Sequence, residues 1–301
     1  MRLLRGDLHH HTHHSDGAES VAEAARRCRA QGYDFLAVTD HDTGAAWREA
    51  AQVSGLTLMP GVEVTTFHGH ALALGTWGPV EWRDLGRGDA PRLFGRIRAA
   101  GGLAAVAHPF FVGGSVCAGC AWDFADWEGA DAVEVWHGPD PQERPHNRAA
   151  LRRWEELLTA GERPVPLGVR DWHGGGEAGE EWASTWVYAA GAALSDVVEA
   201  LRRGRVFVSV GPRLVLTGEG DLLPGDEAAG EVALRLAYLG GWPGTVELRL
   251  VGPQGPWAGR RVRGRGMLEH CWRAAPGEWC RGEVAVGERL LAFTHPVFGP
   301  A

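Results

Sequence analysis

Short apolar runs alternate with amphipathic stretches over the first two thirds of the chain, to about residue 205. Short apolar runs bounded by turn residues are typical of buried strands, and longer stretches with apolar residues at helical spacing are typical of helices. The predicted strands are Leu3 to Leu8, Phe35 to Val38, Leu56 to Val62, Ala71 to Leu74, Leu103 to Ala107, Ala132 to Val135, Val165 to Val169 and Thr185 to Tyr188. The predicted helices are Glu19 to Ala30, Ala45 to Val53, Pro91 to Ala100, His146 to Ala160 and Leu194 to Arg203.

Strands and helices that alternate along a chain predict an α/β domain with a mainly parallel sheet or barrel. After about residue 206 the helical spacing fades, and apolar and polar residues alternate, as in Val232 to Leu239 and Thr245 to Val251. Turns rich in Gly and Pro separate these stretches, which predicts short antiparallel strands. We therefore expect an α/β domain over residues 1–205 and a small antiparallel, sandwich-like β domain over residues 206–301.

Side chains that bind metals recur where the predicted strands end. His9 and His11 follow the first strand, and because residues i and i+2 of an extended chain share a face, they point the same way while His10 points oppositely. Glu63 interrupts an apolar run, where a carboxylate costs several kcal/mol unless it meets a cation. The other candidates of this kind are Asp16, His41, His108, His137, Asp171 and His173. Because the carboxyl ends of parallel strands open onto one face of a βα barrel, their positions favour a metal cluster there.

The histidine-rich stretch from Gly6 to Gly17 has simpler interpretations. A purification tag is normally an unbroken run outside the fold, whereas Thr12 interrupts this run and Ser15-Asp16-Gly17 closes it. Each candidate ligand alone is best interpreted as an ordinary core or loop residue. Their joint occurrence at successive strand ends favours the metal site.

Composition narrows the possible functions. All 30 basic residues are arginine, which excludes lysine-dependent chemistry such as a Walker A loop or a Schiff base. The formal net charge of −8, without a dense Arg stripe, disfavours a long nucleic acid as partner. The sequence has no apolar run long enough for a membrane span and no basic, apolar leader, so we expect a cytoplasmic protein that does not bind membranes.

The five cysteines are few and odd in number for a secreted disulfide scaffold, which predicts a reducing compartment. Cys117 and Cys120 have the spacing of half a zinc ribbon, but no second pair of this spacing follows. We expect two thiols in a loop, with structural zinc as the alternative.

Taken together, these segments resemble the PHP family of metallohydrolases, named for polymerase-associated domains and histidinol phosphatase. The resemblance runs from residue 7 to about 211, over "DLHHHTHHSDG", "AVTDHD", "PGVEVTT" followed by "GHALALG", "AVAHPF", "AVEVWHG" and "GVRDWHG". The segments "CAGCAW" and "LAFTHPVFG" are similar to the branch of the family that includes carbaryl (carbamate ester) hydrolases.

The resemblance implies a distorted (β/α)7 barrel that holds two or three divalent ions, for which Mn, Fe and Zn are all suitable. By motif, the implied ligands are His9, His11 and Asp171 for the first ion, with Glu63 as a bridge to the second, His108 and His137 for the second ion, and Asp16, His41 and His173 for the third.

A metal-dependent hydrolase is the first functional hypothesis. Three divalent ions against three carboxylates leave a cationic pocket, which attracts a small phosphate ester. Metal coordination lowers the pKa of water to roughly 7, so a metal-bridging hydroxide is available to attack phosphorus. The same hydroxide could attack a carbamate or carboxylic ester, which is the alternative activity. A non-catalytic metal-binding interaction module is a further alternative, but the complete ligand set favours the enzyme.

Two residues beside the ligands are candidates for catalysis. His70 is predicted to protonate the leaving group or to support the ligand shell, and Arg170 is either a phosphate clamp or part of a salt bridge. Asp7 and Asp40 are expected to orient ligand imidazoles. The sequence predicts a small ester as the partner and leaves the oligomeric state open.

Overall fold

In the computed structural model, which describes residues 1–114, 117–175 and 180–300, every predicted apolar run of the first part forms a strand and every predicted helical stretch forms a helix. The strands of this part are β1 (Arg2–Asp7), β2 (Phe35–Val38), β3 (Thr57–Thr66), β4 (Gly69–Leu74), β5 (Leu103–Val106), β6 (Ala132–His137), β7 (Val165–Val169), β8 (Ser184–Ala189) and β9 (Val206–Ser209). The helices are α1 (Val21–Ala30), α2 (Trp47–Ala50), α3 (Ala90–Ala99), the 3-10 helix η1 (Pro141–Glu143), α4 (Pro145–Thr159) and α5 (Leu194–Arg202).

The presence or absence of a side-chain cap accounts for how well the lengths of α1 and α2 agree with the predicted helices. At the start of α1, Ser20 Oγ accepts a hydrogen bond from the Glu23 N–H, and the Glu23 carboxylate accepts one from the Ser20 N–H. Such a reciprocal cap satisfies two donors that the first helical turn leaves free. α2 is shorter than the predicted helix from Ala45 to Val53, and no side chain caps its first turn.

The strands β1 to β7 lie in chain order in one sheet, and β8 and β9 continue it beyond the other edge of β1. β1, β2 and β3 are parallel, as are β5, β6 and β7, which agrees with the predicted alternation of strands and helices. β4 is antiparallel to both of its neighbours, because a tight turn rather than a helix joins it to β3.

The predicted barrel is not found as a closed sheet among the described residues. β8 pairs along β1 from Arg2 to Gly6 and so occupies the edge that β7 would need for closure. One isolated parallel bridge, between His10 and Trp172, joins the chain just beyond β1 to the chain just beyond β7. The ends of the two strands therefore meet where the sheet itself stays open.

Where β7 approaches β8, hydrogen bonds from a threonine side chain replace the backbone hydrogen bonds that would otherwise join the two strands. Thr185 Oγ1 accepts a hydrogen bond from the Gly168 N–H (3.0 Å) and donates one to the Gly168 carbonyl (2.9 Å). Glycine is required at position 168, because a Cβ atom there would lie 2.5 Å from Val208 Cγ1 of β9. β7 thereby packs closely against β8 and β9.

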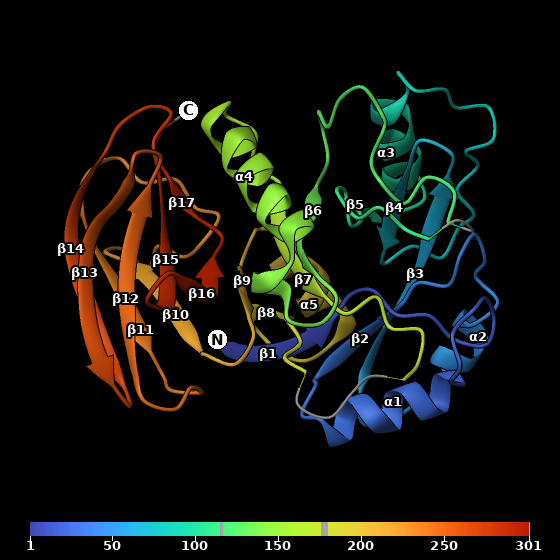
Figure 1. The fold of residues 1–301 in the computed structure, drawn as a ribbon, viewed down its shortest axis with the longest axis horizontal. Helices are drawn as coiled ribbons and strands as arrows, with labels where there is room; N and C mark the ends of the chain where they lie inside the picture. The colour runs from blue at the N-terminus through green and yellow to red at the C-terminus, as the bar shows by residue number, and fades with distance from the viewer. Residues whose placement is uncertain (115–116, 176–179, 301) are drawn as a thin grey trace.

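The antiparallel strands predicted after residue 206 are present, and they gather on one side of the molecule (Figure 1). They are β10 (Leu214–Gly218), β11 (Gly230–Tyr238), β12 (Thr245–Gly252), β13 (Gly255–Arg263), β14 (Gly266–Ala274), β15 (Trp279–Val286), β16 (Arg289–Thr294) and β17 (Val297–Phe298). β10, β11 and β14 form a separate three-stranded sheet. β16 pairs with β9, so β12, β13, β15 and β16 extend the large sheet instead of forming a detached one.

α4 runs along the boundary between the two parts (Figure 1). The ring of Trp154 on α4 lies 5.6 Å from that of Phe293 on β16. Arg281 of β15 is buried and pairs with both Glu155 of α4 and Glu283. Since removing one partner of a buried ion pair is costly, this contact ties the C-terminal strands firmly to α4. No helix among the described residues is long and apolar enough to cross a membrane.

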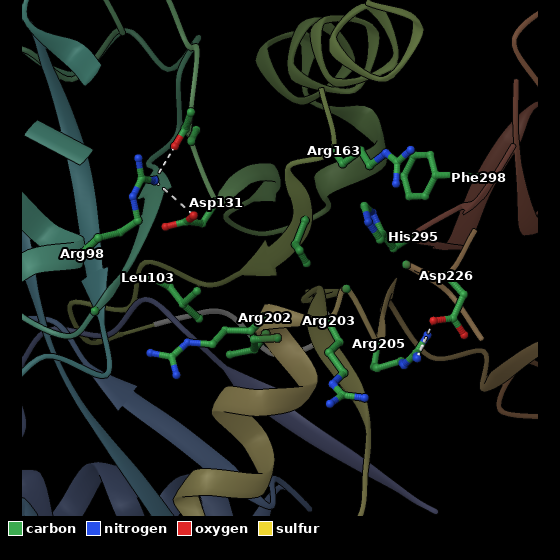
Figure 2. Close-up of a pocket in the computed structure, with 17 residues that line it drawn as sticks. Arg98, Leu103, Asp131, Arg163, Arg202, Arg203, Arg205, Asp226, His295 and Phe298 are labelled. Atoms are coloured by element: carbon green, nitrogen blue, oxygen red, sulfur yellow. Dashed lines mark hydrogen bonds and ion pairs between the residues drawn. The ribbon is translucent and has the colours of Figure 1, made fainter. Parts of the chain in front are cut away.

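A basic cleft of about 870 Å³ lies at the amino ends of β5, β6, β7 and β9. Figure 2 shows Arg98 directed at Asp131 and Arg205 directed at Asp226. Arg163 and Arg203, which also line the cleft, pair with carboxylates as well. None of the predicted site residues is among the residues that line this cleft, so the candidate site lies elsewhere.

Replacing Thr185 with valine should test its role between β7 and β8. Thr185→Val keeps the shape of the side chain but leaves the N–H and carbonyl of Gly168 without their partner, which should lower the free energy of unfolding by about 2 kcal/mol. Urea unfolding measures the change. Thr245→Val, at an exposed position of β12, is the control and should change it by less than about 0.5 kcal/mol. Equal effects of the two substitutions would contradict the proposed contact.

Candidate metal centre

Four buried atoms, which come from the ends of β1 and β7 and from β3, converge on one position. His9 Nε2 lies 3.1 Å from Glu63 Oε2 and 3.2 Å from Asp171 Oδ1, and His11 Nε2 lies 3.2 and 3.0 Å from the same oxygens. None of the four atoms has a hydrogen-bond partner in the described part of the chain. Two ligands at right angles, each about 2.1 Å from one ion, are themselves about 3 Å apart. The spacing therefore fits a divalent cation.

Glu134 of β6 fixes the orientation of His9. Its Oε1 lies 2.7 Å from His9 Nδ1, and its Oε2 accepts a hydrogen bond from the backbone N–H of His108 at 2.6 Å. A carboxylate only accepts, so Nδ1 of His9 carries a proton and Nε2 is the nitrogen directed at the centre for a metal ion. Glu134 was not among the predicted site residues, although a carboxylate inside an apolar strand is the same signal that singled out Glu63.

A second group of ligand atoms surrounds the other oxygen of Glu63. Glu63 Oε1 lies 3.0 Å from His108 Nε2 and 2.9 Å from His70 Nδ1. The outer nitrogens of these rings face backbone carbonyls: His108 Nδ1 lies 3.0 Å from the oxygen of Cys120, and His70 Nε2 lies 2.9 Å from that of Ala118. Because a carbonyl only accepts, each outer nitrogen carries a proton, and each inner nitrogen is the one that would bind a cation beside Glu63.

The antiparallel direction of β4 places His70 in the centre. Its first residues lie at the same edge as the carboxyl ends of the parallel strands, and His70 pairs with Thr65 two residues beyond Glu63. This position is suitable for a residue that binds the metal ion itself, and also for one that supports the ligands, as the sequence predicts for His70. His137 was predicted to share the second ion; its Nε2 lies 2.9 Å from Asp171 Oδ2, and its ring lies 5.1 Å from that of His108.

The third predicted group is wider and more exposed. Asp16 lies 3.5 Å from His41 Nε2 and 3.3 Å from His173 Nε2, and His11 Nδ1 faces the same carboxylate. The side chains of Asp16, His41 and His173 are 54%, 28% and 38% exposed. Asp40 holds the loop that carries Asp16, since its carboxylate accepts hydrogen bonds from Thr12 and Ser15. It thus positions a loop rather than an imidazole.

Arg170 lies behind the cluster and not in it. Its side chain is buried, its Nε donates to Asp7 Oδ2 at 3.0 Å, and its Nη1 donates to Gln31 Oε1 at 2.8 Å. Of the two roles that the sequence left open, this arrangement favours the salt bridge. Asp7 faces Arg170 and the ring of His10, so it does not orient a predicted ligand as expected. His10 points away from His9 and His11, as alternation along the strand predicts.

The loop after β5 covers one side of the second group. Cys117 and Cys120 are joined there by a disulfide, whereas the sequence predicted two free thiols. The free cysteines of the described residues are Cys28, Cys271 and Cys280. An earlier turn of this loop places Phe111 5.0 Å from the ring of His137, which gives the centre an apolar wall.

Two ligand positions have unusual backbone conformations. His108 has φ 25° and Asp171 has φ 50°, and residues other than glycine adopt such values at a cost in energy. Both follow directly after a strand, where the reversal turns the side chain toward the centre.

The charges of the cluster compensate one another in the absence of an ion. Burial raises the pKa of Glu63 and Asp171, but the surrounding imidazoles outweigh it and hold both pKa values well below the ordinary range. Burial opposes protonation of His11 and His108, but the neighbouring carboxylates raise the pKa of each ring to about 9. An ion that binds here must therefore displace protons from the imidazoles.

Comparison with known proteins supports the sequence resemblance. Residues 7–97 match the family model described as PHP domain. A 5'-3' exoribonuclease of Haemophilus influenzae is 46% identical over 63 residues, which cover 20% of this chain and 23% of that protein. The DNA polymerase/3'-5' exonuclease PolX of Bacillus subtilis is 50% identical over 38 residues, which cover 13% of this chain and 7% of that protein. The chain thus spans less than a quarter of the length of either relative.

A solved structure shares the whole architecture. It is a two-domain protein from Bacteroides vulgatus, described as containing a predicted PHP-like metal-dependent phosphoesterase. It superposes with a TM-score of 0.58 and 16% sequence identity over 98% of this chain and 95% of that chain. This similarity shows that both parts of the fold occur together in a known structure.

Replacing Glu134 with glutamine should weaken metal binding without removing a ligand. The neutral amide is a weaker acceptor for the Nδ1 proton of His9, and losses of this kind reduce metal affinity by about 10- to 100-fold. Equilibrium dialysis followed by elemental analysis gives the bound manganese per chain. Glu156→Gln, on the exposed face of α4, should leave the affinity unchanged. An affinity that Glu134→Gln leaves intact would show that Glu134 does not orient His9.

The metal-free protein should lose stability as the pH rises from 6.5 to 9. Folding raises the pKa of His11 and His108 from the ordinary 6.5 to about 9, so their protonation stabilises the folded state fully below pH 6.5. This contribution is lost as the pH passes about 9, and the free energy of unfolding should fall by a few kcal/mol. Urea unfolding of chelator-treated protein measures the trend. Stability that is constant or rises over this interval would contradict it, whereas excess manganese should reverse it.

Proposed function

Because this chain contains a PHP domain, matched over residues 7–97, we propose that it is a metal-dependent hydrolase, and specifically a phosphoesterase that acts on small phosphate esters. The observation that carries the proposal is the convergence of His9 Nε2, His11 Nε2, Glu63 Oε2 and Asp171 Oδ1, all buried and all without a hydrogen-bond partner among the described residues. Unprotonated imidazole nitrogens and carboxylate oxygens are all acceptors and cannot satisfy one another, but a divalent cation that displaces the imidazole protons satisfies all four.

The donor set fits two or three divalent ions. Imidazole and carboxylate ligands suit manganese, iron and zinc alike. The proposed holders are His9, His11, Glu63 and Asp171 for one ion, Glu63 with His70, His108 and His137 for a second, and Asp16, His41 and His173 for a third. When bound, such ions would make the pocket cationic, polarise a phosphoryl oxygen and lower the pKa of a coordinated water.

The side chains around the ligands prepare this site in three ways. Glu134 holds the Nδ1 proton of His9, so Nε2, which faces the centre, is the nitrogen that would bind the cation. The ring of Phe111 lies 5.0 Å from that of His137 and keeps water away from one side. The exposed group of Asp16, His41 and His173 forms the open side, from which we propose that the substrate enters.

The charge balance favours an anionic substrate. Three divalent ions would carry six positive charges, against the three carboxylates of Asp16, Glu63 and Asp171, so the pocket would attract a phosphate group. Both sequence relatives have names that denote cleavage of nucleic acids, which are phosphodiesters. A nucleotide or a short oligonucleotide is therefore within the proposed substrate class. The complete set of ligand side chains argues against a purely structural module.

Metal-loaded protein should hydrolyse p-nitrophenyl phosphate, and His9→Ala with His11→Ala should reduce the rate to that without enzyme. The double substitution removes half of the four convergent atoms, so the first ion loses its site. Release of p-nitrophenolate measures turnover, with manganese, iron and zinc supplied in turn. His13→Ala, an exposed histidine of the same stretch, should retain activity. Turnover that survives in the double variant would exclude this site.

The same assay with other esters distinguishes the substrate classes. A naphthyl carbamate, a carboxylic ester and short RNA and DNA oligonucleotides are compared with the phosphomonoester at equal metal loading. Preference for the carbamate or the carboxylic ester would overturn the phosphoesterase assignment while keeping the hydrolase. Fully loaded protein that hydrolyses none of these esters would contradict the proposed function.

A further inference from the structure

We infer that the Cys117–Cys120 pair is a thiol–disulfide modification site that sets the affinity of the second metal position. The inference rests on the proposed metal centre, since it concerns the ligands around Glu63 Oε1. The disulfide closes a four-residue turn, Cys117-Ala118-Gly119-Cys120, directly beside these ligands. His70, Cys117 and Cys120 each have a potential ligand atom within 4.8 Å of the others.

The turn acts on the metal position through its backbone. The Ala118 carbonyl accepts a hydrogen bond from His70 Nε2 (2.9 Å), and the Cys120 carbonyl accepts one from His108 Nδ1 (3.0 Å). The inner nitrogens of both rings then face the same oxygen, Glu63 Oε1, at 2.9 and 3.0 Å. One disulfide-closed turn therefore fixes the proton position and the orientation of two neighbouring imidazoles.

Close packing leaves this turn little freedom while the disulfide is closed. Gly119 has φ +75°, and a Cβ atom there would lie 2.1 Å from the carbonyl oxygen of Thr66 in β3. On the other side, a Cβ atom at Gly113 would lie 2.5 Å from Cys120 Sγ. Backbone thus packs closely against the turn at Gly119 and against the disulfide at Gly113, and the two glycines allow the close approach.

Reduction would release one end of the turn. Cys117 is half-buried while Cys120 is buried, so we infer that a reductant attacks Cys117. The thiolate of a small dithiol attacks Cys117 Sγ, which breaks the Cys117–Cys120 bond, forms a mixed disulfide and releases Cys120 as a thiolate that takes a proton. The second sulfur of the dithiol then displaces Cys117. In total two electrons and two protons pass to the cysteines, and the dithiol becomes a cyclic disulfide.

The open turn holds His70 and His108 less firmly than the closed one. Because the disulfide no longer holds Cys117, the Ala118 carbonyl that faces His70 can adopt more positions. The same holds to a smaller extent for the carbonyl of Cys120. Loss of a hydrogen-bond partner behind a ligating histidine reduces metal affinity by about 10- to 100-fold. The first position, where Glu134 supports His9, does not depend on this turn.

Manganese binding to the full chain in both redox states tests the inference. Manganese is the probe because it prefers nitrogen and oxygen ligands over sulfur, so freed thiols do not compete for it. Equilibrium dialysis gives the number of ions and the dissociation constant of each position, and alkylation followed by mass measurement gives the number of free thiols. The variant with Cys117→Ser and Cys120→Ser mimics the open turn, and Cys271→Ser, at an exposed free cysteine, is the matched control.

The oxidised protein should carry three free thiols, and reduction should weaken its second manganese position by at least about 10-fold while the first is unchanged. The double variant should bind manganese at the second position as weakly as the reduced protein does, and the dithiol should not change this affinity. In Cys271→Ser, reduction should weaken the second position as much as it does in the unsubstituted protein. Thermal unfolding of each variant shows that it is folded.

Other results overturn the inference. These are equal manganese binding in the two redox states, a double variant that still responds to the dithiol, five free thiols after treatment with an oxidant, or tighter binding after reduction. Redox-independent binding leaves the proposed function standing, whereas a chain that binds no manganese in either state contradicts the metal centre itself. Redox-dependent binding without hydrolysis would support this inference and count against the enzyme.

Discussion

The contact of the buried Glu63 carboxylate with the surrounding imidazoles is the interaction on which the rest of the candidate centre depends. Glu63 Oε2 faces His9, His11 and His41, and Glu63 Oε1 faces His70 and His108, so five imidazoles from three strand ends and β4 are arranged around one side chain. Glu63 itself lies within β3, a strand that is buried along most of its length. A buried carboxylate cannot remain charged without cations or protonated partners near it. The need to compensate this charge holds the surrounding strand ends together.

Much of this arrangement was visible in the sequence. Alternation of side chains selected His9 and His11 over His10, and the recurrence of ligand residues at strand ends located His41, His108, His137, Asp171 and His173 together. The structure brings these side chains to one edge of the sheet, because such placement depends on local periodicity and on the direction of parallel strands, which a pattern of apolar runs records well.

The remaining features depend on contacts that periodicity does not record. The direction of β4 follows from the tight turn after Thr66, and it is this direction that makes His70 a neighbour of Glu63. Glu134 acts through His9, more than a hundred positions earlier in the chain, so nothing around it shows what it faces. The closed barrel was expected from the resemblance, but β8 occupies the edge of β1 that closure requires. The disulfide likewise depends on the path of the loop after β5.

The continuous sheet also determines where the chain can be cut without breaking strand pairing. β9 pairs with β8 on one side and with β16 on the other, so a cut near residue 205 would pass through the middle of a sheet and not through a linker. Removing the chain after such a cut would leave β8, or β9 if it is retained, as a newly exposed edge strand. The unpaired N–H and carbonyl groups of such an edge readily pair with strands of other molecules. β8 is in turn the neighbour of β1, which leads into His9 and His11. The C-terminal strands therefore cover the edge of the same sheet that carries the candidate metal centre.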